Sequence, residues 1–411
     1  MQKMRGLPVL TLLSFVTFVN CFTIPGDVKA TGCQINIKVL PANTPLLLTS
    51  KTREVIFPNL GTSFVNLAQN EKIDLDCPGT GNIQAGGATI VGIAEATCVS
   101  GWDFQISGRQ VNISSVLCSS RITSTARATG KTCWGKGIEI EIGLQLHDGR
   151  FIQQYTSCFD DVARNVLYSR YFLTNNIENQ LTGGTSPSWS EDTFYNLGAR
   201  VNNIYPIATH RVTINKQLGL PDGDLKYVGT GHYYLAKGHL TARTDYMYNA
   251  QQMSTFHYVN SAPQWQTFNG YNWFYFERSL RVYASKNLVD LEVYTGTYGI
   301  STLPHATTGR DVELYFYVDN NGNKAMPIPE LFWKVAYDPI NRAGIAVLGI
   351  NNPYQTDVTK SIICNDVADR LNWLTFDRFR LEYGYIYACT IADFRKVVPN
   401  LPNFDARNIL N

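Results

Sequence analysis

The histidines are the residues of this sequence best suited to proton transfer near neutral pH, because an imidazole gains or loses its proton there. There are six of them: His147, His210, His232, His239, His257 and His305. His239 lies in the segment Ala236-Lys-Gly-His-Leu240, after an apolar run that predicts a strand. Gly238 allows the backbone to turn, and Lys237 places a cation that would keep the imidazole neutral, as a general base must be. A histidine at a strand end is more often structural than catalytic, so a second feature is needed.

That second feature is a polar series with a spacing of four residues. Asn269, Trp273, Glu277 and Arg281 follow one another at this interval, within a stretch (270–286) whose spacing predicts a helix. On a helix they line one face, where the carboxamide, carboxylate and guanidinium would face a cleft. The other interpretation is a solvated Glu277–Arg281 pair, which stabilises many helices.

The segment Thr255-Phe-His-Tyr-Val-Asn260-Ser-Ala-Pro263-Gln264, together with this series, resembles the DNA/RNA non-specific endonucleases. These belong to the ββα-metal, or His-Me finger, superfamily that includes endonuclease G. The family pattern is Asp-Arg-Gly-His, then Asn-x-x-Pro-Gln, then Asn-x3-Trp-x3-Glu-x3-Arg. The last two blocks match at every signature position, and the resemblance covers roughly residues 131 to 400. The whole chain is similar to secreted insect-type nucleases, which carry an additional N-terminal β domain.

The resemblance implies a role for each matching residue. His239 would be the general base that deprotonates water, and Asn260 would orient the site. Asn269 would be the direct protein ligand of a Mg²⁺ ion, for which Mn²⁺ would substitute, and Glu277 would hold the waters of that ion. The implied reaction is hydrolysis of phosphodiester bonds in DNA and RNA, double-stranded forms included, with little sequence preference.

The first block departs from the family pattern, because Ala236-Lys237 stands where the family has Asp-Arg. Lys237 would still contact phosphate, but lysine lacks the planar fork that grips two oxygens at once. Arg164 corresponds loosely to a transition-state arginine that the family has upstream, and it is equally well explained as a surface arginine. The departure leaves a second function open: a weakly active or inactive secreted nucleic-acid-binding protein.

The N-terminus predicts secretion. Lys3 and Arg5 precede the apolar run 7–19, so residues 1–21 form a signal peptide, and no later stretch predicts a membrane span. Its removal takes one cysteine, Cys21, from the nine and leaves eight, an even number that predicts disulfides in more than a hundred possible pairings. Asn112-Ile-Ser is a glycosylation sequon.

Charge provides little support for a polyanionic substrate. Removing Lys3 and Arg5 from the 35 basic residues leaves 33, which equals the 33 acidic residues. A nucleic acid would therefore have to be bound by a local basic groove. Core packing is the more usual role for the nearby aromatic residues, Trp273 in particular, and Trp265 is the best candidate among them to stack on an unpaired base.

The fold class expected is α+β, with a small β-rich domain over 22–130 and the endonuclease domain over 131–411. Short alternating runs separated by Gly and Pro predict strands at 34–40, 72–76 and 88–93 in the first domain. In the second domain, strands are expected at 138–146, 212–215, 225–230, 233–236, 313–318 and 332–337. Protein partners and the oligomeric state are not predicted by any of these features.

Overall fold

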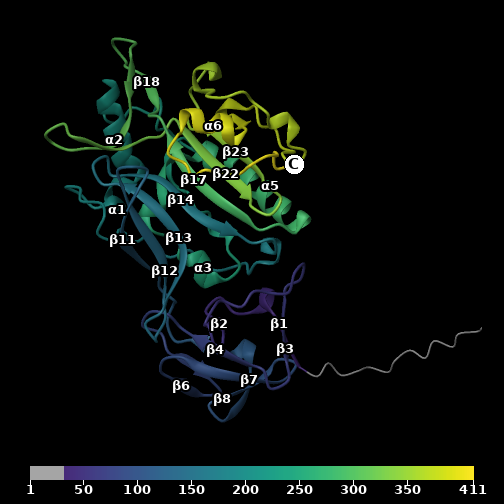
Figure 1. Ribbon diagram of the computed structural model, residues 1–411. Coiled ribbons are helices and arrows are strands. Elements are labelled where there is room, and N and C mark those ends of the chain that lie inside the picture. The colour runs from purple at the N-terminus through teal and green to yellow at the C-terminus, as the bar shows by residue number, and fades with distance from the viewer. Residues whose placement is uncertain (1–31) are drawn as a thin grey trace, which may run out of the picture.

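The computed structural model describes residues 32–411, and the signal peptide predicted at 1–21 lies outside this range. The fold is α+β, as expected, and Figure 1 shows a smaller β-rich part beside a larger mixed body. No helix of the described residues is long and apolar enough to cross a membrane.

The smaller part is built from three antiparallel sheets. The five-stranded sheet has the order β2 (Leu46–Thr49), β4 (Lys72–Asp76), β7 (Ala94–Ser100), β8 (Asp103–Ile106), β9 (Arg109–Asn112). The other two are β1 (Gly32–Asn36) with β3 (Phe64–Ala68), and β10 (Leu117–Cys118) with β5 (Ile83–Ala85) and β6 (Ala88–Ile90). The short helices are η1 (Ile37–Val39) and η2 (Ile113–Ser115). The disulfides Cys33–Cys98 and Cys77–Cys118 cross-link this small core, which is the expected device where few apolar residues are available.

The larger body is organised on an eight-stranded antiparallel sheet. Its order is β11 (Thr125–Cys133), β12 (Gly137–Gln145), β13 (Phe151–Asp160), β14 (Asn165–Leu173), β17 (Leu291–Tyr298), β22 (Leu331–Asp338), β23 (Ala343–Ile350), β24 (Ile386–Cys389). Every residue of β22 is buried, because helices and loops cover both faces of the sheet centre. The domain boundary expected at residue 130 falls within β11.

Between β14 and β17 the chain leaves the sheet and forms the elements that carry the candidate site. They are η3 (Ile177–Asn179), α1 (Val201–Ile204), α2 (Ile207–Leu218), β15 (Leu235–His239), η4 (Arg243–Asp245), α3 (Asn249–Met253), η5 (Tyr258–Asn260), β16 (Ser261–Trp265), α4 (Gln266–Asn269) and α5 (Asn272–Asn287). The buried ring of Trp273 on α5 packs on Phe332 of β22, with ring centroids 5.9 Å apart. The long helix is thereby fixed to the centre of the sheet.

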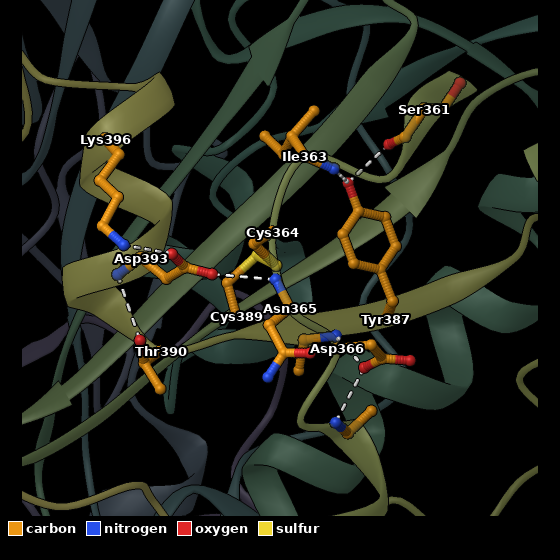
Figure 2. The surroundings of a disulfide bond; sticks show 12 residues. Ser361, Ile363, Cys364, Asn365, Asp366, Tyr387, Cys389, Thr390, Asp393 and Lys396 are labelled. Atoms are coloured by element: carbon orange, nitrogen blue, oxygen red, sulfur yellow. Dashed lines mark hydrogen bonds and ion pairs between the residues drawn. A yellow bond between two sulfur atoms is a disulfide. The ribbon is translucent and has the colours of Figure 1, made fainter. Parts of the chain in front are cut away.

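Short hairpins and a helix complete the body. They are β18 (Thr302–Pro304) with β19 (Asp311–Glu313), β20 (Tyr315–Val318) with β21 (Lys324–Pro327), η6 (Val358–Ser361), η7 (Ala368–Arg370), η8 (Leu381–Tyr383) and α6 (Ile391–Val397). Two further disulfides, Cys133–Cys158 and Cys364–Cys389, complete the four formed by the eight cysteines. Figure 2 shows the second, which ties the segment after η6 to β24. Tyr387 donates to the Ser361 carbonyl at 2.7 Å and the backbone N–H of Asn365 donates to Asp393 at 2.9 Å beside it.

Side chains join the two parts of the chain. The amide of Asn176 donates to the carbonyl of Thr62 at 2.8 Å, and the carboxylate of Asp76 accepts from the backbone N–H of His147 at 3.0 Å. Both Asn176 and Asp76 are buried, so the junction is a packed interface.

Several expected elements are present, four are only partly formed and two are absent. The strand expected at 34–40 ends at Asn36, where η1 begins, and the one at 88–93 ends at Ile90. The strand expected at 233–236 begins only at Leu235, and the one at 313–318 is divided between β19 and β20. Strands at 72–76, 138–146 and 332–337 and the helix at 270–286 are confirmed as β4, β12, β22 and α5. The strand expected at 212–215 is wrong, because these residues lie inside α2, and the segment 225–230 forms no strand. In α2, His210, Ile214 and Leu218 recur every four residues and are buried, which is a helical pattern.

Candidate functional site

The candidate site begins with the hairpin of β15 and β16, followed directly by α4 and α5. The strands pair antiparallel, with Lys237 opposite Pro263 and His239 opposite Ser261. Because side chains alternate along a strand, Lys237 and His239 project from the same face of β15. Two strands followed by a helix form the ββα unit that the sequence predicted.

Position 238 requires glycine because the backbone of β15 lies close to the side chain of Gln264 on β16. A Cβ atom there would lie 2.4 Å from Oε1 and 2.6 Å from Cβ of Gln264, and Gly238 itself is not in the left-handed region. The expectation that Gly238 allows a turn is therefore wrong. Gly238 is needed because the buried Gln264 side chain crosses over its backbone.

Lys237 and His239 open into a cleft of about 650 Å³ whose wall also includes Asn269, Arg243 and Trp189. None of the described residues that line it is an aspartate or a glutamate. The cleft therefore combines an imidazole, a carboxamide and two cationic side chains. It carries a local positive charge in a chain whose overall balance is near neutral.

The imidazole of His239 is enclosed by aromatic rings. Its centroid lies 4.6 Å from that of Trp189 and 5.0 Å from that of Phe256, and its Nε2 atom is buried with no hydrogen-bond partner in residues 32–411. Burial, with help from the charges of Arg243 and Lys334, lowers the pKa of His239 to about 3. The imidazole is therefore neutral at neutral pH. The cations responsible are these two, whereas the sequence pointed to Lys237.

Lys237 is held among rings rather than acids. Its Nζ lies 5.3 to 5.8 Å from the ring centroids of Tyr205, Tyr258 and Trp189, the range of cation–π contacts. Burial lowers the pKa of the Lys237 ammonium group. The side chain presents a single positive charge to the cleft.

Asn269 reaches the cleft from the last residue of α4, where its Nδ2 donates to Oε1 of Gln266 at 3.1 Å. This bond fixes the orientation of the carboxamide. The chain breaks its helical course at Gly270 and Tyr271 before α5 begins at Asn272. The expectation that the four-residue series lies on one helix is therefore wrong, because Asn269 ends α4 and the other three members belong to α5.

Glu277 is not part of the cleft wall and belongs to a separate group of charges in the protein interior. Lys334, whose side chain is fully buried, lies 3.4 Å from the carboxylate of Glu277 and 3.8 Å from that of Asp245. Arg281 donates to Asp245 at 2.9 Å. Burial raises the pKa of Glu277, and Lys334 opposes this rise. The solvated Glu277–Arg281 pair is not formed, because each residue has a buried partner of its own.

Asn260 is fully buried and braces the chain just beyond His239. Its Oδ1 accepts from the backbone N–H of Thr241 at 2.8 Å, and its Nδ2 donates to the carbonyls of Thr241 and Thr255 at 2.9 Å. The carboxamide therefore uses its oxygen and both of its N–H donors in hydrogen bonds to the backbone. Asn260 therefore acts on the position of the His239 segment and does not touch the cleft.

Two other residues singled out by the sequence are not brought to the cleft. Arg164 occupies the turn between β13 and β14, with a positive φ of 53°, and it is not part of the wall. Trp265 is fully buried, so the prediction that it stacks on a base is wrong. Trp273 is buried as well and serves the core.

The structure adds four residues to the site: Trp189, Arg243, Asp245 and Lys334. Trp189 and Lys334 are distant in sequence from the motif blocks, so only folding places them here. Arg243 and Asp245, in contrast, follow His239 by four and six residues. Their charges in a segment that leads away from a strand were the signal that could have found them.

Comparison with known proteins identifies the family of the chain. The profile of the DNA/RNA non-specific endonuclease family matches residues 138–394. A salivary endonuclease of Lutzomyia longipalpis is 25% identical over 382 residues, which cover 90% of this chain and 85% of that protein. Salivary protein Tsal2A of Glossina morsitans morsitans is 22% identical over 410 residues, covering 98% and 97%. A solved structure of an EndoG/EndoGI complex has a TM-score of 0.38 at 16% identity over 64% of this chain and 90% of that one, too distant to carry an argument. On the extent of the profile match, the chain belongs to the DNA/RNA non-specific endonuclease family.

Proposed function

We propose that this protein is a secreted, metal-dependent endonuclease that hydrolyses phosphodiester bonds of DNA and RNA, double-stranded forms included, with little sequence preference. The observation that carries the proposal is the composition of the cleft. A neutral imidazole and a free carboxamide oxygen share a wall with two cations and no carboxylate. Such a wall attracts a phosphodiester and does not repel it.

His239 is the general base in this proposal. Because burial keeps the ring neutral at neutral pH, a lone pair of the imidazole is free to accept a proton from a water molecule as the water attacks phosphorus. The packing of Trp189 and Phe256 keeps the ring in one orientation. Asn260 contributes indirectly, since it fixes the backbone just after His239.

Asn269 is the residue proposed to hold a divalent cation, Mg²⁺ with Mn²⁺ as a substitute. Its amide nitrogen is engaged by Gln266, which leaves the amide oxygen for a hard cation. Residues 32–411 contain no cluster of three or more His, Cys, Asp or Glu side chains suited to a metal, so water would complete the coordination shell. A cation bound here would polarise the phosphate and stabilise the leaving oxygen. Glu277, outside the wall, would act on it only through water.

Low sequence preference follows from the kind of contact that the cleft offers. Lys237 presents a point charge suited to phosphate oxygens, which are the same in every sequence. Arg164 is left out of the proposed site, because it is not part of the wall.

Secretion is proposed on three grounds. The sequence begins with a signal-like segment, its remaining eight cysteines form four disulfides, and relatives are salivary proteins. We also propose that the segments 22–130 and 131–411 act as an accessory β-rich domain and the nuclease domain, with β11 shared at their boundary.

A second candidate is a nucleic-acid-binding protein with weak or no activity on the same fold. The specific observation in its favour is that Lys237 stands where the family pattern has arginine and is surrounded by three aromatic rings. These rings compete with phosphate for its charge.

Incubation of the purified protein with plasmid DNA and with double-stranded RNA separates these candidates. With Mg²⁺ we expect internal cleavage of both substrates, and with excess EDTA we expect none. Binding of both without cleavage in Mg²⁺ or Mn²⁺ would favour the second candidate. Full cleavage in EDTA would contradict the metal dependence.

A further inference from the structure

Arg243 is a half-buried arginine of the cleft wall, and no acid of residues 32–411 forms an ion pair with it. It begins η4, four residues after His239, and its guanidinium forms part of the cleft wall. Nη1 donates to the Ser186 hydroxyl at 3.1 Å, and Nη2 donates to the carbonyl of Gly184. Both partners are neutral, so they orient the guanidinium and leave its charge uncompensated.

The two buried arginines of the described chain have carboxylate partners, whereas the half-buried Arg211, like Arg243, donates only to neutral groups. Arg281 pairs with Asp245 at 2.9 Å, and Arg378 pairs with Asp366 at 3.0 Å. Burial lowers the pKa of Arg243, and no acid of residues 32–411 opposes this effect. A half-buried charge without an acidic partner is less well solvated than one in open water, so this part of the cleft wall is receptive to an anion from solution.

The guanidinium of Arg243 also has N–H groups that form no hydrogen bond within the described residues. A guanidinium carries about five N–H donors in a planar fork, of which the two bonds above use two. The Nε atom of Arg243 has no hydrogen-bond partner among the described residues and is not a buried atom, so its N–H is available to a ligand in the cleft. A phosphate accepts two parallel hydrogen bonds from such a fork, whereas Lys237 offers a point charge.

We propose that Arg243 is a phosphate-binding residue of the cleft and supplies the bidentate grip that Lys237 cannot. The inference rests on the proposed function, since the phosphate belongs to the nucleic acid that His239 attacks. Arg243 and His239 line the same cleft. A phosphate bound by Arg243 is therefore beside the general base.

The test uses Arg243→Gln and Arg243→Lys, with Arg278→Gln as the matched control. Arg278 is exposed on α5 and lies in a different groove, so its loss removes the same charge away from the cleft. Single-turnover cleavage of a labelled duplex is measured in Mg²⁺. Affinity for the same duplex is measured in EDTA at several salt concentrations.

We expect Arg243→Gln to lower the cleavage rate by about 100-fold and to reduce the slope of log affinity against log salt by about one. Arg243→Lys should keep the salt slope but lose about 10-fold or more in rate, because the charge remains and the fork is lost. Arg278→Gln should keep the rate.

Three results would overturn the inference. One is a cleavage rate and a salt slope in Arg243→Gln that equal those of the wild type. Another is a lower rate with an unchanged slope and a lower melting temperature, which would make Arg243 a brace for the Gly184–Ser186 segment. The third is a full rate in Arg243→Lys. Absence of cleavage by the wild type would instead contradict the proposed function, and the salt slope would still report whether Arg243 binds phosphate.

Discussion

The indole of Trp189 lies against the imidazole of His239, with ring centroids 4.6 Å apart and ring planes inclined by 47°. The contact joins residues 50 positions apart, and with Phe256 it encloses the strand-end histidine. The protonation state of His239 therefore depends on a residue outside every motif block.

Trp189→Ala should raise the pKa of His239 from about 3 toward the ordinary 6.5, because water would reach the ring and stabilise its charged form. Titration of the imidazole resonances by NMR, in metal-free protein, measures this shift. Trp189→Phe retains an aromatic ring at the contact and should give a smaller shift. An unchanged pKa in Trp189→Ala would show that the indole does not control the imidazole.

Lys334→Met should lower the free energy of unfolding by about 3–5 kcal/mol, because it leaves two buried carboxylates, Glu277 and Asp245, with a single cation. Adding Glu277→Gln should recover part of this loss. The control is Lys396→Met, which breaks an exposed pair with Asp393 and should cost less than about 1 kcal/mol. Equal effects of the two lysine variants in urea unfolding would contradict the buried charge group.

His210 should make the protein less stable as the pH falls. Its Nδ1 donates to the Tyr205 carbonyl at 3.0 Å, its Nε2 accepts from the backbone N–H of Leu235, and burial lowers its pKa to about 4. Between pH 6.5 and about 4 the unfolded chain binds a proton that the folded chain refuses, so stability is present above pH 6.5 and is lost on acidification.

Across this pH window, His210 should lower the free energy of unfolding by about 3 kcal/mol. Urea unfolding at several pH values should therefore show a smaller decline for His210→Asn than for the wild type, whose His239 contributes in the same direction. Parallel pH profiles of the two proteins would refute the role of His210.

Gly238→Ala should destabilise the β15–β16 hairpin by about 1–3 kcal/mol and abolish most cleavage, because the new methyl group would overlap Gln264. Gly223→Ala is the control, since a Cβ atom at Gly223 would meet no atom within 4 Å. Thermal unfolding and a cleavage assay measure both effects. If Gly238→Ala behaves like Gly223→Ala, the close approach has no consequence.

The motif blocks predicted the local unit well, because its geometry is set by neighbours in sequence. Strand, strand and helix follow one another from residue 235 to 287, so the block order alone placed Lys237, His239 and Asn269 near one another. The break at Gly270 and Tyr271 was not predicted, since a series spaced by four residues does not reveal an interruption between its first two members.

Interactions between distant segments could not be predicted from the sequence. Lys334 is 57 positions from Glu277, and nothing in its strand segment marks it as a buried cation. The β-branched residues of 212–215 suggested a strand, but burial of one face made the segment helical. Pro206 before α2 and Gly219 after it, with a φ of 69°, were the signals that could have corrected this prediction.

The most direct test of the account is single-turnover cleavage of a labelled duplex by the wild type and by His239→Ala in Mg²⁺, with affinity measured in EDTA. Loss of a general base lowers a rate by about 10² to 10⁴. We therefore predict a loss of at least about 100-fold in His239→Ala, with duplex affinity and melting temperature close to those of the wild type. Cleavage by His239→Ala at the wild-type rate would contradict the account.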